Sequence, residues 1–170
     1  MSVVHLVLGG GLRWRLIRAG AFVTLGGLYL APALGITPPL LYRNDGSSMP
    51  QGYYIYAHPP PAARGEIAVL RNPPHFSLPW LMKRVEGVAG DAYCWRPDLG
   101  TQTLNGRPMP PPAPAARALG IPVWLGCRVL QAGEIVGYGS SPDSYDSRYL
   151  GPVEERDLWG LYRPVWAVAP

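Results

Sequence analysis

The sequence predicts a mainly β domain, and three observations lead to that prediction. Glycine and proline contribute 21 residues each, which is typical of a chain rich in turns. Hydrophobic residues make up 48% of the chain, enough for a packed core, whereas charged residues make up only 15%. Short apolar and aromatic runs recur between the glycines and prolines. We therefore expect one β-rich domain, preceded by a single N-terminal transmembrane helix.

The N-terminal region is predicted to be a membrane anchor. Three arginines lie within residues 1–18, and an uncharged run follows that reaches Leu41. Roughly 17–25 apolar residues are enough to cross a bilayer. Because the arginines precede the run, we expect residues 1–18 in the cytoplasm, residues 19–37 in the membrane and residues 38–170 outside. Two alternatives stay open: a signal peptide cleaved at the small residues 31–33, or a buried core helix.

The rest of the chain is predicted to alternate between strands and turns. Strands are expected over Tyr53–Tyr56, Gly65–Leu70, Trp80–Asp91, Ala92–Trp95, Val123–Leu130, Gly133–Tyr138 and Asp157–Trp166. An Asn-Gly hairpin turn is expected within Leu104–Arg107. Residues 108–122 contain six prolines and are expected to run over the surface, and Arg71–Pro79 is a second proline-punctuated loop.

Lys83 is the only lysine in the chain, and every other cationic side chain is an arginine. In a strand, Leu81, Lys83 and Val85 share one face, while Arg84 and Glu86 point the opposite way. Burial between aliphatic residues disfavours the charged ammonium and lowers its pKa. A neutral lysine can act as a general base, which an arginine cannot. The alternative is that Lys83 extends from a strand edge into water.

Two further segments carry polar groups that could work with such a base. Ser48 lies on a bend flanked by glycines, where it can present its hydroxyl and its backbone N–H to a peptide. The alternative is an ordinary polar turn. The segment from Ser140 to Val153 gathers two carboxylates, several hydroxyls and an arginine. Asp146 and Arg148 can pair there and fix the loop.

Several classes of site are disfavoured by the composition. The net charge is +4, but the arginines are scattered, so we expect no nucleic-acid partner. The three histidines are far apart and there are only two cysteines, so we expect no metal and no other cofactor. In an oxidising compartment Cys94 and Cys127 are expected to form a disulfide, the alternative being two separate buried thiols. Serine with lysine is the nucleophile–base pair that remains.

Three separated motifs resemble type I signal peptidases, which are membrane-anchored Ser/Lys proteases. They are Ser48-Met49-Pro50 with Gly52, then Lys83-Arg84-Val85 with Gly87 and Gly90-Asp91, then Asp146-Ser147-Arg148-Tyr149 with Gly151 and Val153. They occur in the expected order over roughly residues 13–166. The short length and Gly126-Cys127-Arg128 look closest to conjugal-transfer peptidases of the TraF type.

The resemblance implies roles for individual residues. Ser48 is the nucleophile, Lys83 its general base, and Ser144 a hydroxyl that orients the lysine. Asp146 and Arg148 support the site as a pair. The oxyanion binds the backbone N–H of Ser48, and Ser47 is a candidate second donor, because Gly46 stands where many signal peptidases have a serine.

The resemblance also implies a signal-peptidase-like fold and a function. We expect an endopeptidase anchored once in a bacterial inner membrane, with its N-terminus in the cytoplasm and its catalytic domain in the periplasm. Its partner is a precursor or pilin with small residues before the cleavage site, and other transfer-apparatus proteins are further candidates. The alternatives are a general signal peptidase, a non-catalytic scaffold of a secretion apparatus and, less favoured, a self-cleaving repressor.

Overall fold

The structure is a computed structural model that describes residues 14–21, 24, 30–31, 34, 37–71 and 80–168. The chain divides into two compact units, residues 1–39 and residues 40–170.

In the first unit, residues 14–21 are helical, as are residues 24 and 30–31. Much of the predicted anchor over residues 19–37, and most of the loop predicted over Arg71–Pro79, lies outside the described residues. Among the residues that are described, no helix is both long enough and apolar enough to span a membrane.

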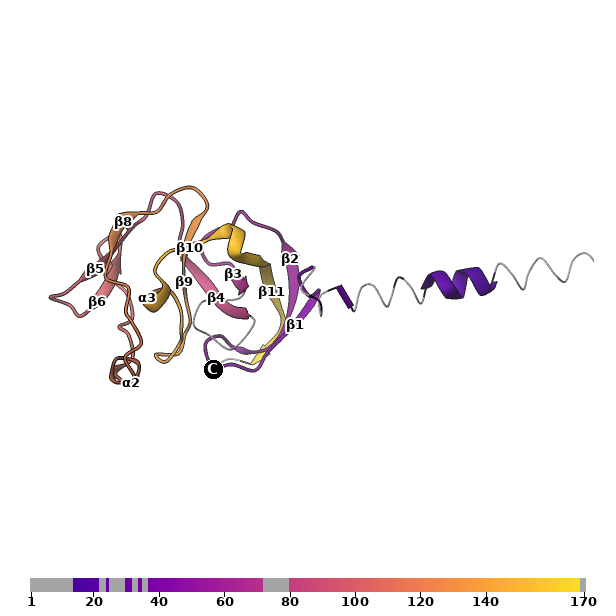
Figure 1. Cartoon of the computed structure of the whole chain (residues 1–170), viewed down its shortest axis with the longest axis horizontal. Helices are drawn as coiled ribbons and strands as arrows, with labels where there is room; N and C mark the ends of the chain where they lie inside the picture. The colour runs from indigo at the N-terminus through magenta and orange to yellow at the C-terminus, as the bar shows by residue number, and fades with distance from the viewer. Residues whose placement is uncertain are drawn as a thin grey trace, which may run out of the picture. The chain divides into compact units, whose positions relative to one another are not determined.

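The second unit contains two antiparallel sheets (Figure 1). The larger has seven strands in the order β1-β2-β11-β3-β4-β9-β10. Their bounds are Leu41–Asn44 (β1), Gln51–His58 (β2), Ile67–Arg71 (β3), Trp80–Gly87 (β4), Glu134–Tyr138 (β9), Val153–Glu154 (β10) and Leu158–Val168 (β11). The mainly β prediction is therefore confirmed for this unit.

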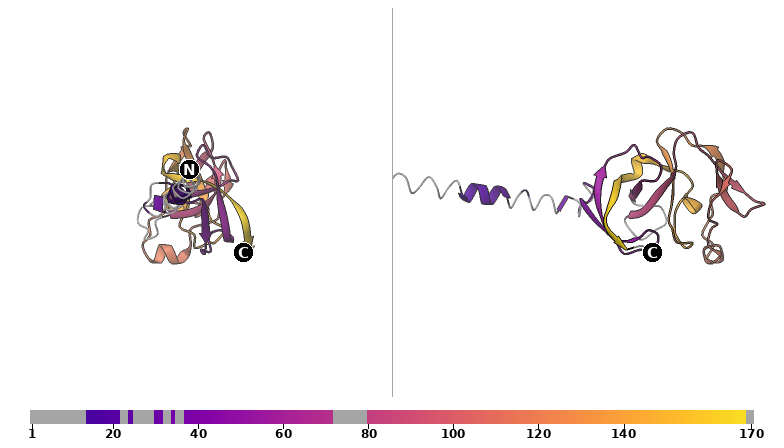
Figure 2. Two further views of the ribbon diagram at one scale, coloured as in Figure 1. Left: turned by 90° about the vertical axis from the view of Figure 1, so that its right-hand side faces the viewer. Right: turned by 180° about the vertical axis from the view of Figure 1, so that it is seen from behind.

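The smaller sheet has four strands in the order β7-β6-β5-β8 (Figure 2). Their bounds are Ala92–Arg96 (β5), Thr101–Leu104 (β6), Arg107–Pro108 (β7) and Cys127–Val129 (β8). The chain enters this sheet after β4 and leaves it before β9, and those two strands are neighbours in the larger sheet. A disulfide joins Cys94 on β5 to Cys127 on β8, which are paired in register.

The two faces of β4 pack into different parts of the core. Leu81 and Val85 belong to one buried cluster, which they share with residues of β3, β9 and β11. Met82 belongs to a second cluster with Met49 and aromatic residues of β2 and β11. Arg84, which lies on the same face of β4 as Met82, is exposed. The alternation predicted from the sequence is thus confirmed, and Lys83 lies on the side of Leu81 and Val85.

Three expectations about local structure need correction. The strand predicted over Val123–Leu130 is wrong in its first half, because only Cys127–Val129 pairs with a neighbour. Trp124 instead donates its backbone N–H to the carbonyl oxygen of Arg148 at 3.0 Å, which ties this segment to a loop. The polar loop after Ser140 contains a helical turn, α3 (Ser147–Leu150), which Asp146 caps.

Residues 108–122 are not exposed throughout. They contain the short helix α2 (Pro114–Ala118), and the side chains of Met109 and Ala113 are buried. The Asn-Gly turn is present as predicted, with Asn105 and Gly106 both at positive φ between β6 and β7.

Candidate active site

Ser48 lies in the loop of the β1–β2 hairpin, and a buried asparagine holds that loop in shape. Asn44, at the end of β1, donates from Nδ2 to the carbonyl oxygens of Met49 at 2.9 Å and Pro50 at 3.1 Å. Tyr54 donates its hydroxyl to the Pro50 carbonyl at 2.6 Å. Because these bonds fix the backbone on the carboxyl side of Ser48, they restrict the direction in which its hydroxyl can point.

Lys83 is buried at the centre of β4, opposite Ala68 of β3. Only 2% of its surface is exposed, so the alternative that it extends into water is wrong. Its amine makes no hydrogen bond and no ion pair with any residue that the structure describes. Burial lowers the pKa of Lys83 to about 8; the charge of Asp146 opposes this change and that of Arg148 adds to it.

Two glycines, Gly137 in β9 and Gly139 directly after it, make room for the polar groups. A Cβ on Gly137 would lie 3.1 Å from Cβ of Lys83. A Cβ on Gly139 would lie 2.2 Å from Oγ of Ser144 and 2.9 Å from Cβ of Ser48. Gly137 and Gly139 together allow Lys83, Ser48 and Ser144 to approach the backbone at the end of β9.

One cavity of about 400 Å³ contains both predicted dyad residues. It is lined by the hairpin loop up to Ser48, by the start of β4 up to Lys83, and by Asp143 and Tyr145. The rings of Tyr42 on β1 and Trp80 on β4, 6.1 Å apart, hold the two sides of this cavity together. Ser48 and Lys83 therefore face a common space, but no hydrogen bond joins their side chains in this structure.

Ser144 is buried, and its hydroxyl has no hydrogen-bond partner within the described part of the chain. The loop that carries it is bound directly to the Ser48 loop. Ser140 donates to the carbonyl oxygen of Ser48 twice, from its backbone N–H at 2.7 Å and from its hydroxyl at 3.1 Å. The structure thus brings Ser48, Lys83 and Ser144 to one place, with a free hydroxyl beside the predicted nucleophile.

Asp146 and Arg148 form the ion pair that the sequence predicted, and both side chains are fully buried. Arg148 donates to Asp146 from Nε at 2.8 Å and from Nη2 at 2.6 Å, which is a two-point contact. Asp146 also accepts from the backbone N–H of Gly139 at 2.9 Å. The carboxylate therefore closes the loop between Gly139 and Asp146 that presents Ser144.

The Arg148 guanidinium also donates to carbonyl oxygens of the same loop, those of Ser141 at 3.0 Å and Pro142 at 3.1 Å. It lies over the ring of Tyr138, 5.3 Å from its centroid. Gln102, in the smaller sheet, donates to the Arg148 carbonyl at 3.0 Å. Despite burial, the partners of Arg148 raise its pKa, so it stays charged.

The backbone N–H of Ser48 donates to no described residue, which leaves it available to an oxyanion. Ser47 is exposed and lines the same cavity.

Several residues of this region were not identified from the sequence. The sequence predicts Asn44 only as part of a polar turn, Gly137 only as a strand residue and Gly139 only as part of the loop that follows the strand. Gln102 lies in a strand that was not predicted. The spacing Gly137-Tyr138-Gly139 was a detectable signal for a close approach on one face of β9.

The protein was also compared with known proteins. Residues 19–167 match the model of the family described as signal peptidase, peptidase S26. Among solved structures, a signal peptidase I from Enterococcus faecalis is similar to this chain, with 19% sequence identity and a TM-score of 0.38. That similarity covers 61% of this chain and 97% of the other. No curated protein matches the sequence significantly. The family match spans most of the chain, and the protein therefore belongs to the S26 signal peptidases, a family of serine-type endopeptidases.

Proposed function

We propose that this protein cleaves exported precursor proteins with Ser48 as nucleophile and Lys83 as general base. The observation that carries the proposal is the buried Lys83, which has no hydrogen-bond partner in the described chain and opens onto the same cavity as Ser48. A structural lysine would be paired or exposed. A lysine that is buried and has no partner in the described chain is disposed to lose its proton.

In this mechanism Lys83 is neutral when the reaction begins. With a pKa of about 8, about a tenth of the protein carries the neutral amine at pH 7 and half at pH 8. The amine takes the proton from Ser48 as the oxygen attacks the carbonyl carbon, and it then gives that proton to the leaving amine. The backbone N–H of Ser48 stabilises the oxyanion.

Ser144 is proposed to orient the Lys83 amine. Its hydroxyl is buried and unpartnered in the described chain, and it lies beside Gly139, where Ser48 also lies. A buried hydroxyl without a hydrogen-bond partner costs free energy. This supports a role in which the Ser144 hydroxyl forms its hydrogen bond only when the Lys83 amine or the substrate turns toward it.

The substrate class and location rest on resemblance and sequence pattern. The TraF-type motifs favour a pilin-type precursor of a conjugation system, and the arginines before the uncharged run favour a single anchor in the inner membrane with the catalytic unit in the periplasm. A general signal peptidase is the second candidate, because the matching family model carries that description. Gly46 in place of a serine, and Gly139-Ser140-Ser141-Pro142 in place of the general Gly-Asp-Asn-Arg loop, favour the specialised enzyme.

The dyad is tested with a precursor that carries alanines before its cleavage site. Ser48→Ala and Lys83→Arg should each abolish cleavage while the protein stays folded, because arginine keeps its charge and cannot accept the proton. Arg163→Lys is the matched control: it exchanges the same two residue types at an exposed position of β11 that does not line the cavity. Full activity of Ser48→Ala or Lys83→Arg would exclude the dyad.

The two candidate roles differ in the range of precursor proteins that the enzyme would cleave. Co-expression with several unrelated secreted precursors and with one pilin-type precursor separates them. We expect processing of the pilin-type precursor alone, and efficient processing of most of the set would favour the general signal peptidase.

A further inference from the structure

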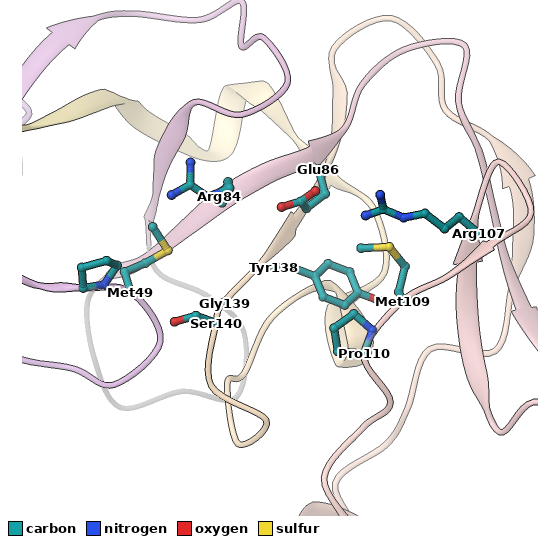
Figure 3. A pocket seen from close by; sticks show the side chains of 10 residues that line it. Met49, Arg84, Glu86, Arg107, Met109, Pro110, Tyr138, Gly139 and Ser140 are labelled. Atoms are coloured by element: carbon teal, nitrogen blue, oxygen red, sulfur yellow. The ribbon is translucent and has the colours of Figure 1, made fainter. Parts of the chain in front are cut away.

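A second cavity, of about 410 Å³, is lined by the residues that directly follow Ser48 in the chain. What we infer about this cavity rests on the proposed function. Met49 lies at one end of it, and Arg107, Met109 and Pro110 lie at the other (Figure 3). Pro50 also belongs to the lining.

The two cavities continue from the predicted dyad in opposite directions along the chain. The first is lined by residues before Ser48 and by β4 up to Lys83. The second is lined by residues after Ser48 and by Arg84 and Glu86, which continue β4 on its other face. An extended peptide whose scissile bond lies at Ser48 can then place its acyl part in one cavity and its leaving part in the other.

Charge distinguishes the two cavities. In the first, Arg43 is paired with Asp45 at 2.8 Å, and Asp143 offsets the charge of Lys83 when the lysine is protonated, so the described lining carries no net positive charge. In the second, the Glu86 carboxylate and the Arg107 guanidinium have no hydrogen bond or ion pair with any described residue. The small uncharged residues expected before the cleavage site fit the first cavity better. The leaving segment is therefore assigned to the second.

Glu86 is aimed into this cavity by an irregularity of the sheet. The register between β4 and β9 shifts between Val85 and Gly87, so Glu86 sits on a bulge. Bulges redirect side chains and are common beside active sites. Arg84 is held in place by donating to the carbonyl oxygen of Gly65 at 2.9 Å, and Figure 3 shows Arg84, Glu86 and Arg107 around the same space.

We infer that this second cavity is the binding site for the segment on the carboxyl side of the scissile bond, and that Arg107 gives it a preference for an acidic side chain. Two arginines and one glutamate leave the lining with a net positive charge. Arg84 is anchored to the backbone, whereas Arg107 is exposed and unpaired among described residues, and so it is the group best placed to meet a carboxylate.

The test measures binding separately from cleavage. Dye-labelled peptides carry an Ala-x-Ala sequence before the scissile bond and neutral residues after it, with a single Glu, Gln or Lys moved through the first four positions. Fluorescence anisotropy with the full chain carrying Ser48→Ala should show, at one position at least, about three- to tenfold tighter binding of the Glu peptide than of the Lys peptide at low salt.

Charge reversal identifies the group responsible. Adding Arg107→Glu should reverse the order of the Glu and Lys peptides. Arg163→Glu on β11 makes the same charge change at an exposed residue outside both cavities and should leave the order unchanged. Glu86→Gln gives an independent reading, because removing the only carboxylate of the lining should increase the preference for the Glu peptide.

The outcomes are decisive for each proposal. An order of binding that Arg107→Glu leaves unaltered, no difference between Glu and Lys at any position, or no binding of any peptide would overturn the site. Cleavage of the same peptides by the wild-type protein tests the dyad. Arg107-dependent binding without cleavage would reject the proposed function alone, and cleavage without charge preference would reject this inference alone.

Discussion

Two cations are buried in this small region, and they differ in their partners. Lys83 is 2% exposed and donates no hydrogen bond to a described residue. Arg148 is fully buried, yet it is paired with Asp146 and donates to the carbonyl oxygens of Ser141 and Pro142. The pKa of Lys83 falls to about 8, and that of Arg148 rises.

The difference shows that burial alone does not decide what a buried cation does. Burial opposes both charges, but the carboxylate and carbonyl oxygens around Arg148 outweigh it. The charge of Asp146 raises the pKa of Lys83 and that of Arg148 lowers it, so the two charges leave the effect of burial largely uncompensated. Arg148 is therefore suited to hold the loop, and Lys83 is suited to exchange a proton.

The largest expected effect comes from breaking the paired cation. Arg148→Met should lower the free energy of unfolding by about 3–5 kcal/mol, because it leaves Asp146 buried without its partner. Urea denaturation measures this change. Arg96→Met is the matched control, since Arg96 is also paired two residues away with an aspartate, Asp98, but at the surface. Equal losses in the two variants would contradict the contrast between buried and exposed pairs.

Removing Lys83, the cation without a partner in the described chain, should change the free energy of unfolding in the opposite direction. Lys83→Met is expected to raise the free energy of unfolding by about 3 kcal/mol at pH 7, because the folded protein no longer holds a lysine whose pKa lies near 8 instead of its ordinary 10.5. The free-energy cost of burying Lys83 has its full value below pH 8, and it disappears as the pH rises to about 10.5. The advantage of Lys83→Met should shrink over that interval, and a constant advantage from pH 7 to 11 would argue against burial as its cause.

The same pKa predicts the pH dependence of cleavage. Below pH 8, kcat/KM should rise about tenfold per pH unit as Lys83 loses its proton, and it should level off above pH 8. Initial rates between pH 5.5 and pH 9.5 measure the profile. A rate that is flat from pH 6 to pH 9 would mean that the base is another group.

The smallest expected change in stability is that of Ser144→Ala. Since the Ser144 hydroxyl has no partner in the described chain, its removal should alter the free energy of unfolding by less than about 0.5 kcal/mol. Cleavage should nevertheless fall about tenfold if the hydroxyl orients Lys83. A variant with full activity would show that Ser144 does not act on the lysine.

The alternating pattern around Lys83 predicted which face of the strand it shares with Leu81 and Val85, but it left open whether the side chain is buried or extends into water. The structure decides for burial. The Asp146–Arg148 pair and the bend at Ser48 were predicted from the residues themselves, whereas Ser144 was singled out by resemblance. The structure places all of them together. Their roles in the reaction remain predictions.

Features that depend on contacts distant in the sequence could not be predicted. Gln102 lies in a polar stretch, Thr101–Leu104, with no apolar alternation, yet the whole strand is buried. The Gln102 amide is satisfied there by the carbonyl oxygens of Trp124 and Arg148, which are distant in the sequence. The segment before Cys127 has strand-like residues. It does not pair as a strand, because its backbone is bound to Arg148 and its Trp124 ring stacks on Tyr93 at 4.8 Å.

The adjacency of β4 and β9 has a consequence for engineering. Because these strands are neighbours, the segment between Gly87 and Glu134 leaves and re-enters the larger sheet at one place and can be treated as an exchangeable cassette. The cassette is not inert, since it carries Arg107 of the second cavity and the amide of Gln102 that supports the Arg148 loop. A chimera that replaces it has to preserve the Gln102 amide and the buried contacts of the segment with β9, so that the groups proposed to break the peptide bond keep their positions.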